Sequence, residues 1–152
     1  MLELMLVIIT ISAPNLELIE ESYSESLNYE VVERGQVTDE LASVWNAPRM
    51  AGRDVLLMQP ESKANFYLRF VQVDAVDGYG AMKTFGWNAT EILVQDPDEL
   101  AKQLRANNSA FKIVGEPRTL SATSDIRAMQ VIGPADEVVY LMYSAKEKDH
   151  GP

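Results

Sequence analysis

Short apolar segments alternate with polar ones along the chain, and these segments predict eight β-strands. Each segment is rich in β-branched or aromatic residues and is bounded by turn residues, which is the pattern of strands in folded domains. The expected strands cover residues 4–12, 29–34, 53–59, 65–73, 89–95, 111–115, 126–131 and 137–143.

A different periodicity follows the first strand and predicts a helix that begins after Asn15. Leu16, Ile19, Tyr23 and Leu27 recur at steps of three and four, whereas the glutamates of this segment fall elsewhere. Such spacing gathers the apolar side chains on one face of a helix, and asparagine is a favoured N-cap.

A second helix is predicted by the signals at its start. Asp96 is an N-cap acid, Pro97 suits the first helical position, and Glu99 follows three residues after the cap. Leu100 and Leu104 then form the expected core face.

The order of elements repeats, which indicates a duplicated unit. Each half reads as strand, helix and three strands. The first half has a further helical segment, at residues 38–45, between its second and third strands. The last strands of the halves, 66–70 and 139–143, have similar patterns. We therefore expect an α+β protein made of two βαβββ modules.

Aligning the two helix caps also aligns the first strands of the halves. In this alignment Ile8 and Thr10 correspond to Ala89 and Glu91.

Composition excludes several kinds of chemistry. The 152 residues include no cysteine and one histidine, His150. A disulfide framework, an iron–sulfur site, a cysteine nucleophile and a multi-histidine metal centre are therefore excluded. A metal site built from carboxylates, amides and water is left open by these counts.

The charge balance argues against polyanionic partners. Lys and Arg number 13 against 23 Asp and Glu, which gives a formal net charge of −10. Nucleic acids and anionic membranes need a positive surface, so we expect neither as a partner. The apolar stretch Met5–Ile9 is far shorter than the ~20 residues of a membrane span, and Glu3 stands where a secretory signal would carry a base. We expect a cytoplasmic protein.

Three segments, in this order, carry a resemblance to a known superfamily. Asn15–Val32 is similar to a first helix with its exit into a strand, Val94–Leu100 to a "V-x-D-P-D-x-L" helix start, and Gly133–Leu141 to a closing "D-P-D-G-N-x-I-E-L" turn and strand. Together they resemble the vicinal-oxygen-chelate superfamily, which includes glyoxalase I, bleomycin-resistance proteins and extradiol dioxygenases. The resemblance extends from about residue 4 to residue 143.

This resemblance implies a fold and a domain organisation. The two modules would curve into an open cup of mixed eight-stranded sheet. A single domain would span residues 1–143, with module one at 1–74 and module two at 87–143, and residues 144–152 would form a polar tail or the start of a linker.

The resemblance also places a metal site, which this sequence does not fit. In the superfamily the metal is held by histidine, glutamine or glutamate side chains from the first and last strand of each module. The matching positions here are Ile8, Tyr67, Ala89 and Tyr140. A slip of two residues would instead bring in Thr10, Arg69, Glu91 and Met142. Neither set suits a divalent cation, so we expect no metal and no cofactor.

The implied cup suits a small organic ligand. Its expected lining mixes apolar, phenolic and charged groups, which is typical of small-molecule sites, and consists of Ile8, Thr10, Tyr67, Arg69, Ala89, Glu91, Tyr140 and Met142. We therefore expect a metal-independent domain that binds an aromatic or anionic metabolite, with Arg69 gripping a carboxylate or phosphate.

Other interpretations of these residues stay open. The two tyrosines could simply fill the cup, and Arg69 and Glu91 could form a structural ion pair. If Glu91 were buried away from Arg69, it could act as the base of a lyase, an isomerase or a dioxygenase-like enzyme. The chain could also be the inactive structural half of a tandem protein. The resemblance further implies a homodimer or a second domain of the same superfamily as partner.

Overall fold

All eight expected strands and the expected helices are present in the structure, a computed structural model that describes residues 6–83, 89–121 and 125–145. The remaining residues, including most of the expected polar tail and the first two residues of module two, lie outside the described ones. The elements are β1 (Val7–Ala13), α1 (Leu16–Leu27), β2 (Tyr29–Gln36), α2 (Asp39–Val44), the short 3₁₀ helix η1 (Pro48–Met50), β3 (Asp54–Pro60), β4 (Phe66–Gln72), β5 (Ala89–Leu93), α3 (Pro97–Ala106), β6 (Lys112–Thr119), β7 (Ile126–Ile132) and β8 (Val138–Ser144).

The strands form two four-stranded mixed sheets, and this confirms the predicted pair of βαβββ modules. The strand order is β1-β4-β3-β2 in the first sheet and β5-β8-β7-β6 in the second. In each sheet the first strand is parallel to the fourth, and the other pairs are antiparallel. Within the described part of the chain no ladder joins the two sheets, so they do not form one closed sheet.

The two longer helices begin where the capping residues predict. The Asn15 side chain accepts a hydrogen bond from the backbone N–H of Leu18 at 3.0 Å, and one carboxylate oxygen of Asp96 accepts from the N–H groups of residues 98 and 99. These bonds satisfy N–H groups that have no partner inside the helix. No helix in the described ranges is long and apolar enough to cross a membrane.

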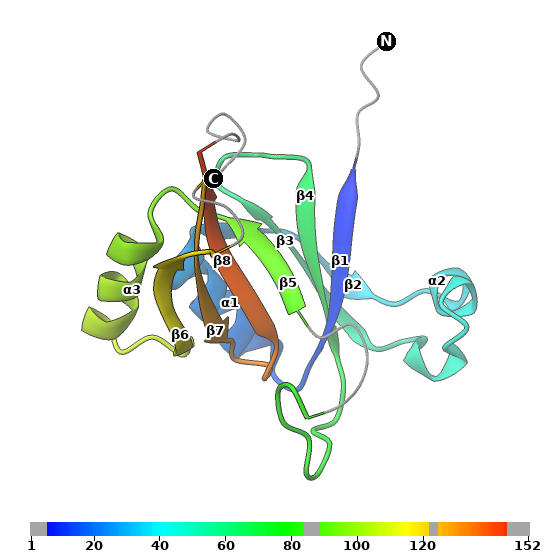
Figure 1. Ribbon diagram of the computed structural model, residues 1–152. Coiled ribbons are helices and arrows are strands. Elements are labelled where there is room, and N and C mark those ends of the chain that lie inside the picture. Colours follow the sequence, from blue (N-terminus) through cyan, green and yellow to red (C-terminus); the bar gives the residue numbers. More distant parts are fainter. Residues whose placement is uncertain (1–5, 84–88, 122–124, 146–152) are drawn as a thin grey trace.

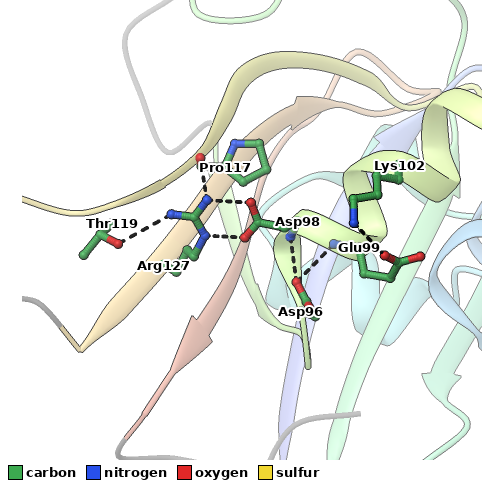
Figure 2. A network of polar contacts seen from close by, with 7 residues as sticks. All are labelled: Asp96, Asp98, Glu99, Lys102, Pro117, Thr119 and Arg127. Carbon is green, nitrogen blue, oxygen red and sulfur yellow. Dashed lines mark hydrogen bonds and ion pairs between the residues drawn. The ribbon is translucent and has the colours of Figure 1, made fainter.

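An arginine ties the start of α3 to the neighbouring sheet. Figure 2 shows the guanidinium of Arg127, on β7, lying against both carboxylate oxygens of Asp98. The same guanidinium donates to the carbonyl oxygen of Pro117 at 3.1 Å. These hydrogen bonds from Arg127 hold the pKa of Asp98 below its ordinary value.

One hydrophobic core joins the two modules, and Tyr23 of α1 lies inside it. The ring of Tyr23 contacts Tyr29 and Phe70 of its own module and Phe111 of the other, with ring centroids 4.9–5.8 Å apart. In Figure 1, α1 lies behind β7 and β8, and the core cluster contains residues from both sheets and both longer helices. The helix-covered faces of the two sheets therefore meet in a shared core.

Each sheet keeps a second face that is turned away from this core, which we call its open face. Because side chains alternate along a strand, residues two apart share a face. In β1, Ile9, Ile11 and Ala13 contribute to the core, whereas Ile8 and Thr10 are exposed on the open face. The open face of each sheet thus lies on the side of that sheet opposite to the core.

The outer edges of the sheets, β2 and β6, are irregular and charged. The pairing of β2 with β3 shifts between Val31 and Glu33, and the pairing of β6 with β7 shifts twice. Both strands are longer than predicted, because the predicted ends at Gly35 and Gly115 lie inside them. An edge strand tolerates glycine, and also Pro117, because one side of its ladder needs no partner.

Candidate functional site

The site residues predicted on the first sheet share its open face. Ile8 lies opposite Tyr67 and Thr10 lies opposite Arg69 in the parallel pair of β1 and β4. Ile8 is 37% exposed, and Tyr67 and Arg69 are half-buried. These four residues therefore form one surface.

The residues predicted on the second sheet form a separate surface on its open face. Glu91 lies opposite Tyr140, and Ala89 and Met142 lie further along the same two strands. The eight predicted residues are thus divided four to each sheet, and Thr10 of the first group and Ala89 of the second line a common pocket of about 440 Å³.

The sheet register corrects the predicted internal alignment of the modules. Ile8 faces Tyr67 and Glu91 faces Tyr140, so Ile8 corresponds to Glu91 and not to Ala89. β1 ends two residues before its helix cap Asn15 and β5 ends three residues before its cap Asp96, so counting back from the caps does not reproduce the register of the strands. A shift of two keeps every residue on its predicted face.

Gln59 holds the hydroxyl of Tyr67. The side-chain amide nitrogen of Gln59 donates to the Tyr67 oxygen at 3.1 Å and to the backbone carbonyl of Ala64 at 3.0 Å. Gln59 is 9% exposed. The hydroxyl of Tyr67 is thus fixed at the surface of the open face by a buried neighbour.

Gln130 holds the hydroxyl of Tyr140 in the second module. Its amide nitrogen donates to the Tyr140 oxygen at 2.9 Å and lies 3.7 Å from the sulfur of Met82. The linker after β4 therefore reaches the open face of the second sheet at Met82.

Arg69 lies over an aromatic ring. Its guanidinium carbon is 5.5 Å from the ring centroid of Trp45, at the end of α2. Trp45 belongs to a small second core, with Val37, Ala42 and Val71 at its centre. This core fixes the ring that supports the guanidinium, and α2 stands out from the side of the first sheet in Figure 1.

The alternative ion pair between Arg69 and Glu91 is not formed. Among the residues that the structure describes, the Arg69 guanidinium has no carboxylate partner and no hydrogen-bond acceptor. Glu91 is exposed and also has no cation beside it within the same ranges. The buried setting that would favour a base at Glu91 is therefore absent in this chain.

The side chains at the four strand-centre positions do not fit a divalent metal. Ile8, Tyr67, Glu91 and Tyr140 supply one carboxylate, two phenols and one hydrocarbon. Both phenol oxygens already accept a hydrogen bond from a glutamine. No group of three or more His, Cys, Asp or Glu in the described segments could hold a metal ion. Neutral phenols are poor ligands beside a single carboxylate.

Sequence reasoning did not find Gln59 and Gln130. A signal for them is present, since each glutamine lies in the third strand of its half and shares a face with the tyrosine of the fourth strand. The repeated pair becomes visible only when the hydrogen-bond partners are known, because the spacing differs: Gln59 and Tyr67 are eight residues apart, and Gln130 and Tyr140 are ten.

Comparison with solved structures identifies the fold. A glyoxalase family protein from Bacillus cereus matches with a TM-score of 0.64 and 13% identity over 95% of each chain. A glyoxalase family protein from Enterococcus faecalis has a TM-score of 0.63 and 14% identity over 88% of this chain and 93% of its own.

Glyoxalase I from Zea mays has a TM-score of 0.64 and 19% identity over 92% of this chain, which spans 44% of the maize protein. The chain therefore has the glyoxalase fold, the fold of the vicinal-oxygen-chelate superfamily. No protein-family model matches its sequence, and no curated protein is detectably similar to it.

Proposed function

We propose that this protein is a metal-independent domain that binds an anionic aromatic metabolite on its open faces. The observation that carries this proposal is Arg69, which lies over Trp45 without any acceptor among the described residues. A half-buried guanidinium normally finds a carboxylate or carbonyl, because its donors are costly to leave unpaired. A ligand carboxylate or phosphate would satisfy it.

The neighbours of Arg69 support an aromatic ligand. Tyr67 is two residues away on the same face of β4, and Ile8 and Leu57 lie on the adjacent strands. Such a surface offers ring contact and apolar contact beside the cation, and a few aimed polar groups on an apolar lining are typical of metabolite sites.

The proposal includes a second copy of the chain, or a second domain of the same fold, as the other wall of the site. One open face is a shallow surface, whereas small-molecule sites enclose most of their ligand. The predicted lining residues of one chain are divided between two sheets that no ladder joins in the described residues, so the proposed site takes its second wall from another sheet.

The first experiment is to release small molecules from the purified protein, identify them by mass spectrometry, and measure metals in the same sample. A bound aromatic acid and the absence of stoichiometric metal are expected. Benzoate is then titrated into ¹⁵N-labelled protein. Arg69→Gln should weaken benzoate binding about tenfold, because a charged hydrogen bond is lost. Stoichiometric metal, or equal binding by both proteins, would contradict the proposal.

Glu91 gives a second candidate function, a base that removes a proton beside a carbonyl. It lies opposite the phenol of Tyr140 and is exposed in this chain, so a base at this position would need the second wall of the proposed site to bury it. Deuterium exchange at the methyl group of pyruvate, followed by NMR, tests this. If the wild-type protein accelerates this exchange and Glu91→Gln does not, a base at Glu91 is supported. If the exchange rate is the same in that variant, this role of Glu91 is excluded.

A further inference from the structure

The same glutamine–tyrosine pair is built twice, once on each open face. Gln59 on β3 meets Tyr67 on β4, and Gln130 on β7 meets Tyr140 on β8. These strands are the third and fourth of their modules. The rest of the two faces differs in sequence, so the repeated pair is a common feature of both halves of the site.

The first pair has a defined hydrogen-bond direction. Gln59 donates one N–H to the carbonyl oxygen of Ala64, which can only accept, and this contact fixes which end of the amide is the nitrogen. The other N–H points to the hydroxyl of Tyr67. The phenol oxygen is therefore the acceptor, and its own proton is directed away from Gln59.

The second pair has the same direction. The amide nitrogen of Gln130 lies between the Tyr140 hydroxyl and the sulfur of Met82, and both contacts are consistent with a donor at that position. The proton of Tyr140 is again left for another acceptor. No acceptor for either phenol proton is found in the described part of the chain.

We propose that Gln59 and Gln130 are positioning residues that turn the hydroxyl protons of Tyr67 and Tyr140 toward the ligand. This inference rests on the proposed function and specifies its ligand class. On the first sheet, Tyr67 and Arg69 then both present donors, two residues apart on one face. The ligand is therefore an oxyacid whose carboxylate and carbonyl oxygens are acceptors, and amines are rejected.

The tyrosine variants test the donor role. Benzoate is titrated into ¹⁵N-labelled wild-type protein and the variants Tyr67→Phe and Tyr140→Phe, with benzylammonium as a probe that has no acceptor. We expect benzoate to shift the amide signals of β4, and the dissociation constant to rise about tenfold in Tyr67→Phe because a hydrogen bond to a charged group is lost. Tyr140→Phe should lower the affinity in the same direction.

A matched control uses the same chemical change on the opposite face. Tyr143 lies on β8, three residues after Tyr140, and so points to the other side of the sheet. Tyr143→Phe should leave the dissociation constant for benzoate unchanged. If it weakens binding as much as Tyr140→Phe does, the loss is a general effect of the substitution and the donor role is overturned.

Gln59→Glu tests the positioning role directly. A carboxylate of the same shape accepts the phenol proton, so Tyr67 can no longer donate to the ligand. We expect Gln59→Glu to weaken benzoate binding in the wild-type background more than in the Tyr67→Phe background. Gln103→Glu makes the same chemical change on the exposed surface of α3, away from the phenol and Arg69, and it measures the effect of net charge alone. Equal losses in both backgrounds would overturn the inference.

The two levels of the proposal fail differently. If benzoate shifts no signal on the open faces, or benzylammonium binds more tightly, the proposed function fails and the ligand class fails with it. If benzoate binds, Arg69→Gln weakens it and Tyr67→Phe does not, the proposed function stands and only the positioning role is lost. Thermal unfolding of each variant confirms that it is folded.

Discussion

At the level of single residues, Glu137 is unusual because it is an acidic residue buried in the protein. Its carboxylate is 8% exposed and accepts from the hydroxyl of Tyr23 at 2.8 Å and from the backbone N–H of Ala135 at 2.7 Å. Burial raises the pKa of Glu137 above its ordinary value, although these two hydrogen bonds oppose the rise. A raised pKa means that this group favours the folded state most when it is protonated.

Glu137→Gln is therefore expected to stabilise the protein at neutral pH. The contribution of a carboxyl with a raised pKa is fully present below about pH 4.3 and is lost as the pH rises through its folded pKa. In the neutral amide the oxygen accepts from the Ala135 N–H and the nitrogen donates to the Tyr23 oxygen, as a protonated carboxyl would, so the loss is avoided and the free energy of unfolding should rise by about 1 kcal/mol at pH 7.

Urea unfolding of both proteins between pH 4 and pH 8 measures this difference. The gap between them should close at the acid end of the range. A gap that is constant with pH would show that ionisation of Glu137 is not its cause. Glu137→Ala, which removes both hydrogen bonds, should destabilise the protein at every pH.

Gly133 is predicted to be intolerant of a side chain because of the same carboxylate. A Cβ atom at this position would lie 2.1 Å from a carboxylate oxygen of Glu137, inside any allowed contact. Gly133→Ala should lower the free energy of unfolding by about 2 kcal/mol through overpacking. Gly35→Ala is the control, since its nearest contact would be 3.7 Å, and a similar loss in both variants would count against this cause.

At the level of elements, one charged pair joins the start of α3 to β7. Arg127 engages both oxygens of Asp98 in the first turn of the helix, as Figure 2 shows. A bidentate pair has a more defined geometry than most surface ion pairs. It also places a negative charge at a helix N-terminus, where the helix dipole favours it.

Asp98→Asn should destabilise the protein at neutral pH and have no effect in acid. The lowered pKa of Asp98 means that its contribution is present above about pH 3.9 and is lost as the pH falls through the folded pKa. Thermal unfolding of both proteins from pH 7 down to pH 2.5 checks this. Glu99→Gln, which alters only the exposed contact with Lys102, is the control and should change the midpoint less.

The elements were predictable where their signals are local. The N-caps at Asn15 and Asp96 and the apolar steps of α1 depend on neighbouring residues, and the structure confirms them. The ends of β2 and β6 were not predictable from Gly35 and Gly115. Glycine and proline end a central strand, but these two strands are edges, and edge position depends on the tertiary arrangement.

At the level of the whole molecule, the two modules are one packing unit. Tyr23 belongs to module one, yet its ring contacts Phe111 and its hydroxyl bonds Glu137, both in module two. The buried core continues from one sheet to the other. Neither module can keep this surface buried without its neighbour.

Tyr23→Ala is therefore expected to destabilise both modules together, by about 4 kcal/mol, because a large buried ring is removed. Amide hydrogen exchange measures the opening free energy of β4 and β8 separately. Both should fall by the same amount if unfolding is cooperative. A loss of protection confined to β4 would contradict a single cooperative unit. Val44→Ala, at a side chain that is 76% exposed, serves as the control.

The sequence indicates which face of a strand each candidate site residue occupies, but it does not indicate which residues that side chain contacts. Alternation along β4 and β8 placed Tyr67, Arg69 and Tyr140 on open faces, and the register agrees. The separation of the two groups was not predictable, because it depends on how the modules pack. The contact of Arg69 with Trp45 likewise depends on the position of α2, which no local pattern determines.

The bulged and charged outer strands have a consequence for how molecules of this protein can assemble. β2 and β6 end their ladders with shifted registers, and they carry Glu30, Glu33 and Arg34 on one strand and Lys112, Glu116 and Arg118 on the other. A neighbour that tried to extend a sheet at β2 or β6 would meet mismatched amides and a strand rich in charged side chains. Addition of strands at these two edges is thereby disfavoured, and association of molecules is directed to the other surfaces.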